Sequence, residues 1–70
     1  MNKNILKKIG KNIRFKRKDK ELSQEKLAEL CNMSRNGVGS IERGEVNVSI
    51  LTLCKIAKAF EVELCELLQF

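Results

Sequence analysis

Residues 35–43 carry polar side chains at the spacing of one helix face. If each residue advances by about 100° around a helix, four polar residues fall within an arc of about 140°. They are Arg35, Asn36, Ser40 and Arg43. Val38 and Ile41 fall on the opposite side, where they would face a core. Arginine and asparagine can each make two hydrogen bonds to one base, guanine and adenine respectively, and serine is permissive. This face therefore offers hydrogen-bonding chemistry for base edges in a DNA major groove, although an ordinary solvated helix face has the same pattern.

The sequence has few residues suited to catalysis, disulfide formation or metal binding. The sequence contains no histidine, which removes histidine-based acid–base catalysis, Ser–His triads and histidine metal sites. The three cysteines are Cys31, Cys54 and Cys65, and they are widely spaced without a CxxC motif, so they suit neither a disulfide framework nor a zinc site. We expect small core residues in a reduced, cytoplasmic compartment, with a redox role left open for Cys65. The prediction is a protein without enzymatic activity, cofactor, metal or small-molecule substrate.

The length and charge of the chain bound its class. Seventy residues with 43% apolar content make one domain, 1–70, and three Phe without Trp or Tyr imply an aliphatic core. Lys and Arg outnumber Asp and Glu by 14 to 9, a net charge of +5. Residues 1–20 hold nine basic residues against one acid, and residues 21–70 hold five against eight. The basic end suits a polyanionic partner, although a solvated helix face can carry the same charges. The acidic end is expected to point away from such a partner.

The first predicted helix spans residues 4–18. Its apolar stripe consists of Ile5, Leu6, Ile9 and Ile13, with Arg17 at the edge. Lys16 falls inside the stripe and Phe15 falls opposite it, and both are anomalies. A basic helix of this kind can also lie on a membrane surface, but so small a protein needs the stripe for its core. Its apolar runs are far too short to span a membrane. We therefore expect no membrane partner.

Three serines mark the starts of further helices. Ser23, Ser34 and Ser49 are good N-caps. Asn32 stands where the second helix must stop, and asparagine tolerates the left-handed backbone conformation. The link to a third helix, 35–43, is then three to four residues long, the length of a helix-turn-helix turn. Gly44 ends that third helix.

Two more helices complete the predicted fold. The fourth places four apolar residues at helical spacing: Leu53, Ile56, Ala57 and Phe60. A short fifth covers residues 64–68, with Glu63 where a cap is expected. No segment shows useful strand alternation. The sequence therefore predicts an all-α, compact, five-helix domain.

Two motifs resemble a known family. Residues 22–28 read Leu-Ser-Gln-Glu-Lys-Leu-Ala, and residues 41–44 read Ile-Glu-Arg-Gly. With these motifs the chain resembles, over residues 9–68, the phage-repressor and Cro type of helix-turn-helix regulator. Residues 45–49 also look like a stretch of restriction–modification controller proteins, which are small stand-alone regulators. The resemblance implies a lambda-repressor-like DNA-binding domain whose second and third helices form the helix-turn-helix.

The resemblance implies roles for residues at matching positions. Base contacts fall to Arg35, Asn36 and Ser40. Phosphate contacts fall to Gln24, Arg43, Asn47, Arg17 and Ser34. Arg17 and Glu42 would form a partly buried ion pair, and both stand at the border of an apolar stripe. Gln24 would also brace the third helix.

Five residues depart from the family pattern. Gly37 and Gly39 interrupt the third helix, and each glycine in a helix interior costs about 1 kcal/mol relative to alanine. They either let the helix backbone approach DNA closely or leave the helix loose until it binds. Lys16 replaces an apolar residue, and its alkyl stem is expected to cover the core while its ammonium reaches solvent. Glu21 replaces a glycine and Val46 replaces an arginine.

The function implied is sequence-specific DNA binding by a transcriptional regulator. Its partner would be double-stranded DNA with a near-palindromic operator, read by a homodimer because one helix reads only a few base pairs. The dimer surface is expected in the last two helices, at Leu64, Leu67, Leu68 and Phe70. No room remains for a ligand-sensing domain, so control would come from protein concentration. A protein-interaction module of the antitoxin or anti-repressor kind is the alternative.

Overall fold

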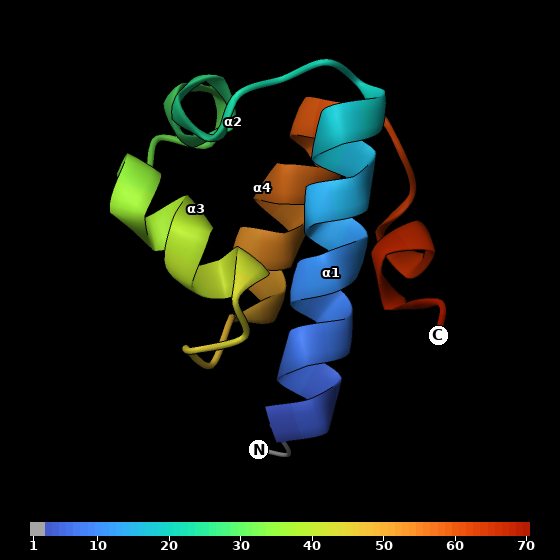
Figure 1. Ribbon diagram of the computed structural model, residues 1–70. Helices are drawn as coiled ribbons and strands as arrows, with labels where there is room; N and C mark the ends of the chain where they lie inside the picture. Colours follow the sequence, from blue (N-terminus) through green and yellow to red (C-terminus); the bar gives the residue numbers. More distant parts are fainter. Residues whose placement is uncertain (1–2) are drawn as a thin grey trace.

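The chain folds into four α-helices followed by one short 3-10 helix, and the computed structural model describes residues 3–70 (Figure 1). The elements are α1 (Lys3–Asp19), α2 (Gln24–Leu30), α3 (Arg35–Glu42), α4 (Ile50–Phe60) and η1 (Leu64–Leu68). The all-α prediction is confirmed, but the count of five α-helices is wrong. The last is a five-residue 3-10 segment, a form that suits short pieces of chain. Residues 1 and 2 of the predicted domain lie outside the described residues. No helix within 3–70 is long and apolar enough to cross a membrane.

Serine side chains begin three of the α-helices, as predicted. Each Oγ accepts a hydrogen bond from the backbone N–H three residues further along the chain. The pairs are Ser23 with Lys26, Ser34 with Gly37, and Ser49 with Thr52. Each cap satisfies an N–H that the first turn of a helix leaves without a partner. The starts of α2, α3 and α4 are therefore set by local sequence.

Left-handed backbone follows each of the four α-helices. Asn32 after α2 has a φ of 55°, as predicted, and Gly44 after α3 has a φ of 70°. Glu21 and Glu61 have φ values of 58° and 59°, although glutamate does not favour this region. Glu21 stands where the family resemblance expects glycine. The chain therefore keeps the backbone turn there without the residue that adopts it most easily.

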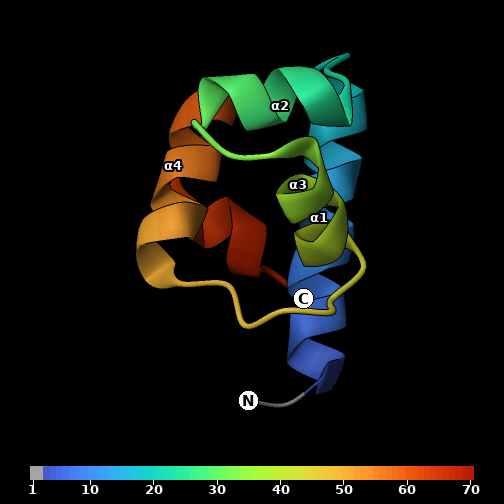
Figure 2. The same cartoon turned by 90° about the vertical axis from the view of Figure 1, so that its left-hand side faces the viewer.

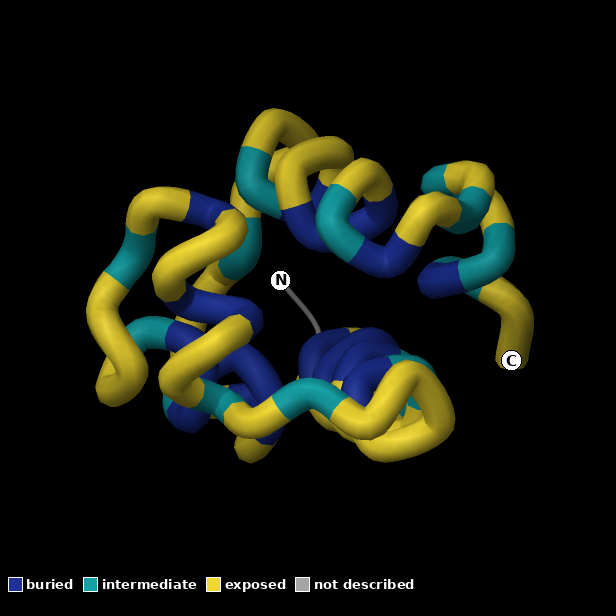
Figure 3. Tube along the Cα trace, turned by 90° about the horizontal axis from the view of Figure 1, so that it is seen from above, coloured by how far each residue is buried: buried dark blue, intermediate teal, exposed yellow. Residues whose placement is uncertain are grey.

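The core lies between α1, α3 and α4, and α2 crosses one end of the molecule (Figures 1 and 2). α2 packs against α3, and α3 packs in turn against α1. Figure 3 shows the buried parts of the helices turned toward the interior. The largest side chains less than 2% exposed are Phe60, Ile13, Leu27, Ile56, Leu67 and Val38. Apart from Phe60 these are aliphatic, as the composition predicts.

Glycine permits close contact between α1 and the end of α3. A Cβ atom at Gly10 would lie 2.5 Å from the carbonyl oxygen of Glu42 and would also collide with that of Ile41. A Cβ atom at Gly44 would lie 2.8 Å from the backbone nitrogen and Cα of Lys7. The φ of 70° at Gly44 is a second reason for glycine there. The two glycines hold the first half of α1 against the C-terminal end of α3.

The chain end packs on the side of α1 that lies away from α3 (Figure 1). Asn12 Nδ2 donates hydrogen bonds to the carbonyl oxygens of Leu67 and Gln69, at 3.0 and 2.9 Å. Lys16 Nζ lies 3.4 Å from Glu66 Oε1, so its ammonium is paired rather than simply solvated. The acidic chain end therefore contacts the basic helix, on the face opposite α3.

Candidate nucleic-acid interface

The outer side of α3 is a row of accessible polar side chains. Arg35 and Asn36 are exposed and Ser40 is half-buried. Val38 and Ile41 are buried, and they fix which side of the helix faces outward. Guanidinium, carboxamide and hydroxyl groups in this arrangement can meet base edges in a major groove. The structure thus brings the three residues expected to contact bases onto one surface.

Arg43 lies back over α3 because Gly39 has no side chain. A Cβ atom at Gly39 would lie 2.9 Å from Arg43 Nη1, so an alanine there would displace the guanidinium. Arg43 Nε also lies 3.0 Å from Glu45 Oε2, and both side chains of this pair are more than half exposed. Gly39, an anomaly in the sequence of a helix, makes room for an arginine on the outer face of that helix.

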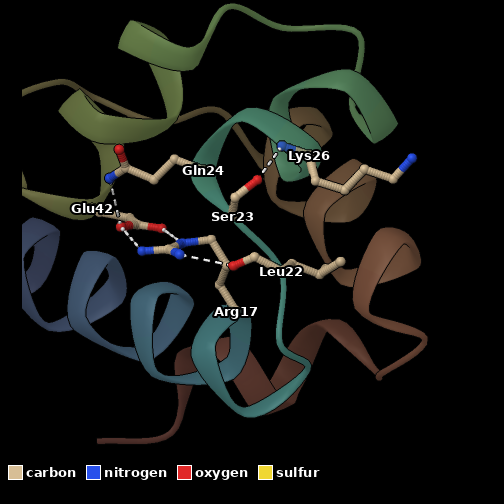
Figure 4. Close-up of polar contacts among 6 residues, drawn as sticks. All are labelled: Arg17, Leu22, Ser23, Gln24, Lys26 and Glu42. Atoms are coloured by element: carbon tan, nitrogen blue, oxygen red, sulfur yellow. Dashed lines mark hydrogen bonds and ion pairs between the residues drawn. The ribbon is translucent and has the colours of Figure 1, made fainter.

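Arg17 and Glu42 form the expected ion pair between α1 and α3, and Gln24 joins it from α2 (Figure 4). Arg17 Nε donates to Glu42 Oε2 at 2.6 Å and Arg17 Nη2 donates to Oε1 at 3.1 Å. The two side chains are 10% and 3% exposed. Arg17 Nη1 donates to the carbonyl of Leu22 at 2.9 Å, and Gln24 Nε2 donates to Glu42 Oε1 at 3.1 Å. One carboxylate therefore ties α1, α2 and α3 together.

The same contacts give Arg17 a structural role. All three guanidinium nitrogens donate to protein oxygens, and the residue is 8% exposed. These bonds use three of the five N–H groups of the guanidinium. Arg17 therefore holds α1 to α3, and its expected phosphate contact stays a prediction.

The other expected phosphate contacts are accessible. Ser34, Arg43 and Asn47 are exposed and Gln24 is half-buried. Ser34 Oγ accepts from the backbone N–H of Gly37 at 2.9 Å, so its hydroxyl hydrogen remains able to donate. Gln24 uses one amide hydrogen on Glu42 and has a second. Donors are thus available at the start of α2, at both ends of α3 and in the connection that follows it.

The turn between α2 and α3 spans residues 31–34 and contains a buried cysteine. Cys31 is 2% exposed, and burial raises the pKa of its thiol, so the reactive thiolate form is disfavoured. Cys54 and Cys65 are exposed. The expectation of a core cysteine is therefore right for Cys31 and wrong for Cys54. Among residues 3–70, no group of three His, Cys, Asp or Glu side chains is placed to hold a metal ion.

A cleft of about 580 Å³ lies between the start of α1 and the connection from α3 to α4. Its lining residues are Lys3, Leu6, Lys7, Arg43, Gly44, Glu45 and Asn47. Two of them, Arg43 and Asn47, are expected phosphate contacts. Lys3 and Lys7 belong to the basic first helix that suits a polyanionic partner, and their spacing of four residues places both on one side of that helix.

Comparison with known proteins decides the family. Residues 13–67 match the HTH_3 family of helix-turn-helix proteins. The chain belongs to the helix-turn-helix family. It is a DNA-binding transcriptional regulator of this family, and α2 and α3 form the helix-turn-helix.

Two curated relatives and one solved structure are similar to this helix-turn-helix protein over most of their lengths. Control protein C.SmaI of Serratia marcescens is 42% identical over 60 residues, which cover 86% of this chain and 71% of that protein. Control protein C.BamHI of Bacillus amyloliquefaciens is 42% identical over 71 residues, covering 100% and 88%. The crystal structure of the restriction-modification controller protein C.AhdI from Aeromonas hydrophila is 43% identical. Its TM-score is 0.90, with 93% of this chain and 94% of that one covered.

The residues expected at a dimer surface are mostly turned into the helix-turn-helix domain itself. Leu67 is fully buried, and Leu64 and Leu68 pack partly buried against the same core. Leu67 is excluded from a surface contact because the hydrogen bonds from Asn12 draw η1 onto α1. Phe70 is 65% exposed, with its ring 5.8 Å from the ammonium of Lys8.

The start of α4 carries exposed apolar side chains that the sequence analysis missed. Ile50 is 60% exposed and Leu51 is 76% exposed, and Cys54 is exposed on the same helix. The available signal was their position outside the helical spacing of Leu53 and Ile56, which are buried. They give α4 an exposed apolar surface in its first turn.

Proposed function

We propose that this helix-turn-helix protein is a transcriptional controller that acts in the cytoplasm as a homodimer on a near-palindromic operator. Two relatives are named control proteins, and a third similar protein is titled a restriction-modification controller. The likeness extends over most of each chain, which supports giving this protein the same kind of role. A twofold dimer would place two recognition helices about 34 Å apart, one turn of DNA.

The exposed outer side of α3, held rigidly from behind, is the observation that carries this proposal. The buried carboxylate of Glu42 connects α3 to Arg17 of α1 and to Gln24 of α2. Side chains that read bases must be presented in a fixed position, because hydrogen bonds lose strength quickly with poor distance and angle. The network gives the recognition helix that fixed position while its polar side stays free.

Two sets of contacts divide the work of binding. Arg35, Asn36 and Ser40 would contact base edges, because they lie on the accessible side of α3. Gln24, Ser34, Arg43 and Asn47 would contact phosphates, which position the protein on the duplex without reading sequence. Arg17 would support the second set by binding Glu42, which also accepts from Gln24, and its own phosphate contact stays a prediction.

The dimer surface would include the first turn of α4. Ile50 and Leu51 are large and exposed there, and water exclusion from such side chains favours association. Phe70 remains a second candidate, since it is also exposed. A contact through α4 would lie near the recognition helix and so set the spacing between the two copies of α3.

Selection of bound sequences from a pool of random duplexes tests this function. The expected result is a near-palindrome with two half-sites about 10 base pairs apart, bound by two copies of the chain. Sizing the complex by light scattering would give the stoichiometry. Recovery of unrelated sequences, with affinity no greater than for random DNA, would favour the protein-interaction alternative.

Substitution separates reading from positioning. Arg35→Ala should reduce affinity for the selected operator by about 1–3 kcal/mol and relax preference at one base pair in each half-site. Gln24→Ala should weaken binding to operator and random duplexes alike, as loss of a phosphate contact does. Fluorescence anisotropy with both duplexes measures the two effects. An unchanged ranking of sites for Arg35→Ala would show that this residue does not read bases.

A further inference from the structure

The cleft between α1 and the α3–α4 connection gathers positive charge beside the recognition helix. Lys3 and Lys7 come from α1, and Arg43 and Asn47 come from the segment after α3. Glu45 is the one carboxylate in the lining, so three cations face one anion. In Figure 2 the connection after α3 runs beside the first half of α1. A concave surface of this charge suits a segment of polyanionic backbone.

The cleft is rigidly joined to the recognition helix. The missing side chain at Gly10 lets α1 touch the carbonyls at the end of α3, and Gly44 touches the backbone of Lys7. Movement of α1 relative to α3 would break both contacts. Lys3 and Lys7 are therefore carried at a set position next to α3, in contrast to lysines on a free tail.

Glu45 has a distinct place in this cleft. Its Oε2 lies 3.0 Å from Arg43 Nε, and both side chains are more than half exposed. A phosphate that binds Arg43 must share the guanidinium with this carboxylate or displace it. An exposed ion pair contributes about 0–1 kcal/mol, so displacement is feasible, but the negative charge remains beside the phosphate.

We propose that Lys3, Lys7, Arg43 and Asn47 form a second phosphate-binding site, which grips the DNA backbone beyond the bases that α3 reads, and that Glu45 limits its affinity. This proposal rests on the proposed function, since it places the cleft on the same duplex as the recognition helix. It names which lysines of the basic helix α1 would contact DNA. The family resemblance expects an arginine at position 46, where this chain has Val46. In this proposal Lys3 and Lys7 supply positive charge on the same side of α3.

The salt dependence of DNA binding tests the site. Each phosphate contact steepens the plot of log affinity against log salt concentration by about 0.9. The variant Lys3→Gln/Lys7→Gln should therefore reduce this slope by about 2, and should reduce the loss of affinity between 50 and 200 mM salt about tenfold. The matched control is Lys8→Gln/Lys11→Gln, which removes two charges from the same helix outside the cleft. The control should change the slope by less than about half a unit.

Glu45→Gln provides a second measurement in the opposite direction. Loss of the carboxylate should strengthen binding several-fold to operator and random duplexes alike, and the gain should shrink as salt rises. The gain should also shrink in a Lys3→Gln/Lys7→Gln background, because the same phosphates are involved. Circular dichroism of each variant checks that the fold is retained.

The outcomes separate this proposal from the function it rests on. If wild-type protein selects an operator and the two double variants have equal slopes, Lys3 and Lys7 bind no phosphate in the cleft and the proposal is overturned. Unchanged or weaker binding by Glu45→Gln would overturn the role given to that carboxylate. If wild-type protein selects no operator, the proposed function itself fails, whatever the slopes of the variants.

Discussion

Glu42 accepts side-chain hydrogen bonds from two other helices although it is almost fully buried. Its carboxylate receives two from Arg17 and one from Gln24, and Arg17 gives its remaining nitrogen to the Leu22 carbonyl. Every buried side-chain nitrogen and oxygen in the described part of the chain has a partner. A buried charge is tolerated when it is paired and hydrogen-bonded, because these contacts replace the hydration that it loses. Removal of one partner leaves the other charge buried without that compensation.

Substitution of either charged partner is expected to be strongly destabilising. Glu42→Gln or Arg17→Met should lower the free energy of unfolding by about 3–5 kcal/mol, because the remaining ion stays buried. The double variant Arg17→Met/Glu42→Met should lose much less than the sum of the single effects. Urea unfolding followed by circular dichroism measures all three. Losses below about 1 kcal/mol for the single variants would show that the pair behaves like an exposed one.

At the scale of helices, glycine has different effects at two positions. Gly10→Ala should destabilise the protein by about 1–3 kcal/mol, since its Cβ would collide with the carbonyl oxygens of Ile41 and Glu42. Those oxygens belong to backbone and cannot swing aside. The measurement is the thermal midpoint and the urea midpoint of the purified variant.

Gly39→Ala is the matched comparison. Its Cβ meets only the flexible end of Arg43, so alanine should add up to about 1 kcal/mol of stability through better helix propensity. The displaced guanidinium should at the same time weaken DNA binding. Equal effects of the two alanines on stability would contradict the contact between Gly10 and α3.

The stability of η1 should depend on pH through Glu66. The backbone N–H of Glu63 donates to its carboxylate at 3.0 Å and Lys16 pairs with it, and together they lower the pKa of Glu66. A lowered pKa in the folded state stabilises the protein above the unfolded-state pKa, and the contribution is lost as the pH falls through the folded-state pKa. Glu66→Gln should therefore lower the thermal midpoint near neutral pH, and its difference from wild type should shrink as the pH falls through the folded-state pKa of Glu66.

Lys16→Gln distinguishes the two partners of Glu66. The backbone hydrogen bond is the larger cause of the lowered pKa, so this variant should retain most of the pH dependence. If Lys16→Gln abolishes it as completely as Glu66→Gln does, the ion pair rather than the backbone hydrogen bond is the main source of the pH dependence. Thermal scans of the three proteins at a series of pH values from neutral to acid give the answer.

Local signals explain which elements were predictable. Serine caps and the left-handed Asn32 act within a few residues of chain, so they set α2, α3 and the turn from sequence alone. The packing of η1 on α1 includes a contact between Asn12 and the Leu67 carbonyl, which are 55 residues apart. The spacing of apolar residues along a single helix cannot predict such a contact between distant elements.

Across the whole molecule, α1 separates two kinds of surface. One side of α1 contacts the recognition helix and contributes Lys3 and Lys7 to the cleft, while the opposite side binds the acidic chain end (Figure 1). The charge sums of the sequence predicted basic and acidic ends. They did not predict that the acidic chain end packs against the basic helix α1, because net charge carries no information on packing.

The assembly of two copies is the prediction that belongs to the whole molecule. Leu51→Glu should abolish the dimer. Leu51 is 76% exposed at the proposed contact, and a carboxylate in its place would lose its hydration when the two copies associate. Sedimentation velocity over a range of concentrations measures the change. Binding to a single half-site should persist, with the cooperative gain from the second half-site lost.

Phe15→Glu is a suitable control for this experiment. Phe15 is 73% exposed on the outer side of α1, so the substitution changes a similar exposed apolar area away from α4 and should leave the dimer intact. Phe70→Glu tests the chain end in the same way. Dissociation by Phe70→Glu, with a stable Leu51→Glu dimer, would move the interface to the side of α1 that carries η1. In each copy α1 stands between η1 and α3, so two copies joined at η1 would carry their α3 helices on opposite outer faces of the dimer. A near-palindrome with half-sites one turn apart would then no longer fit both α3 helices.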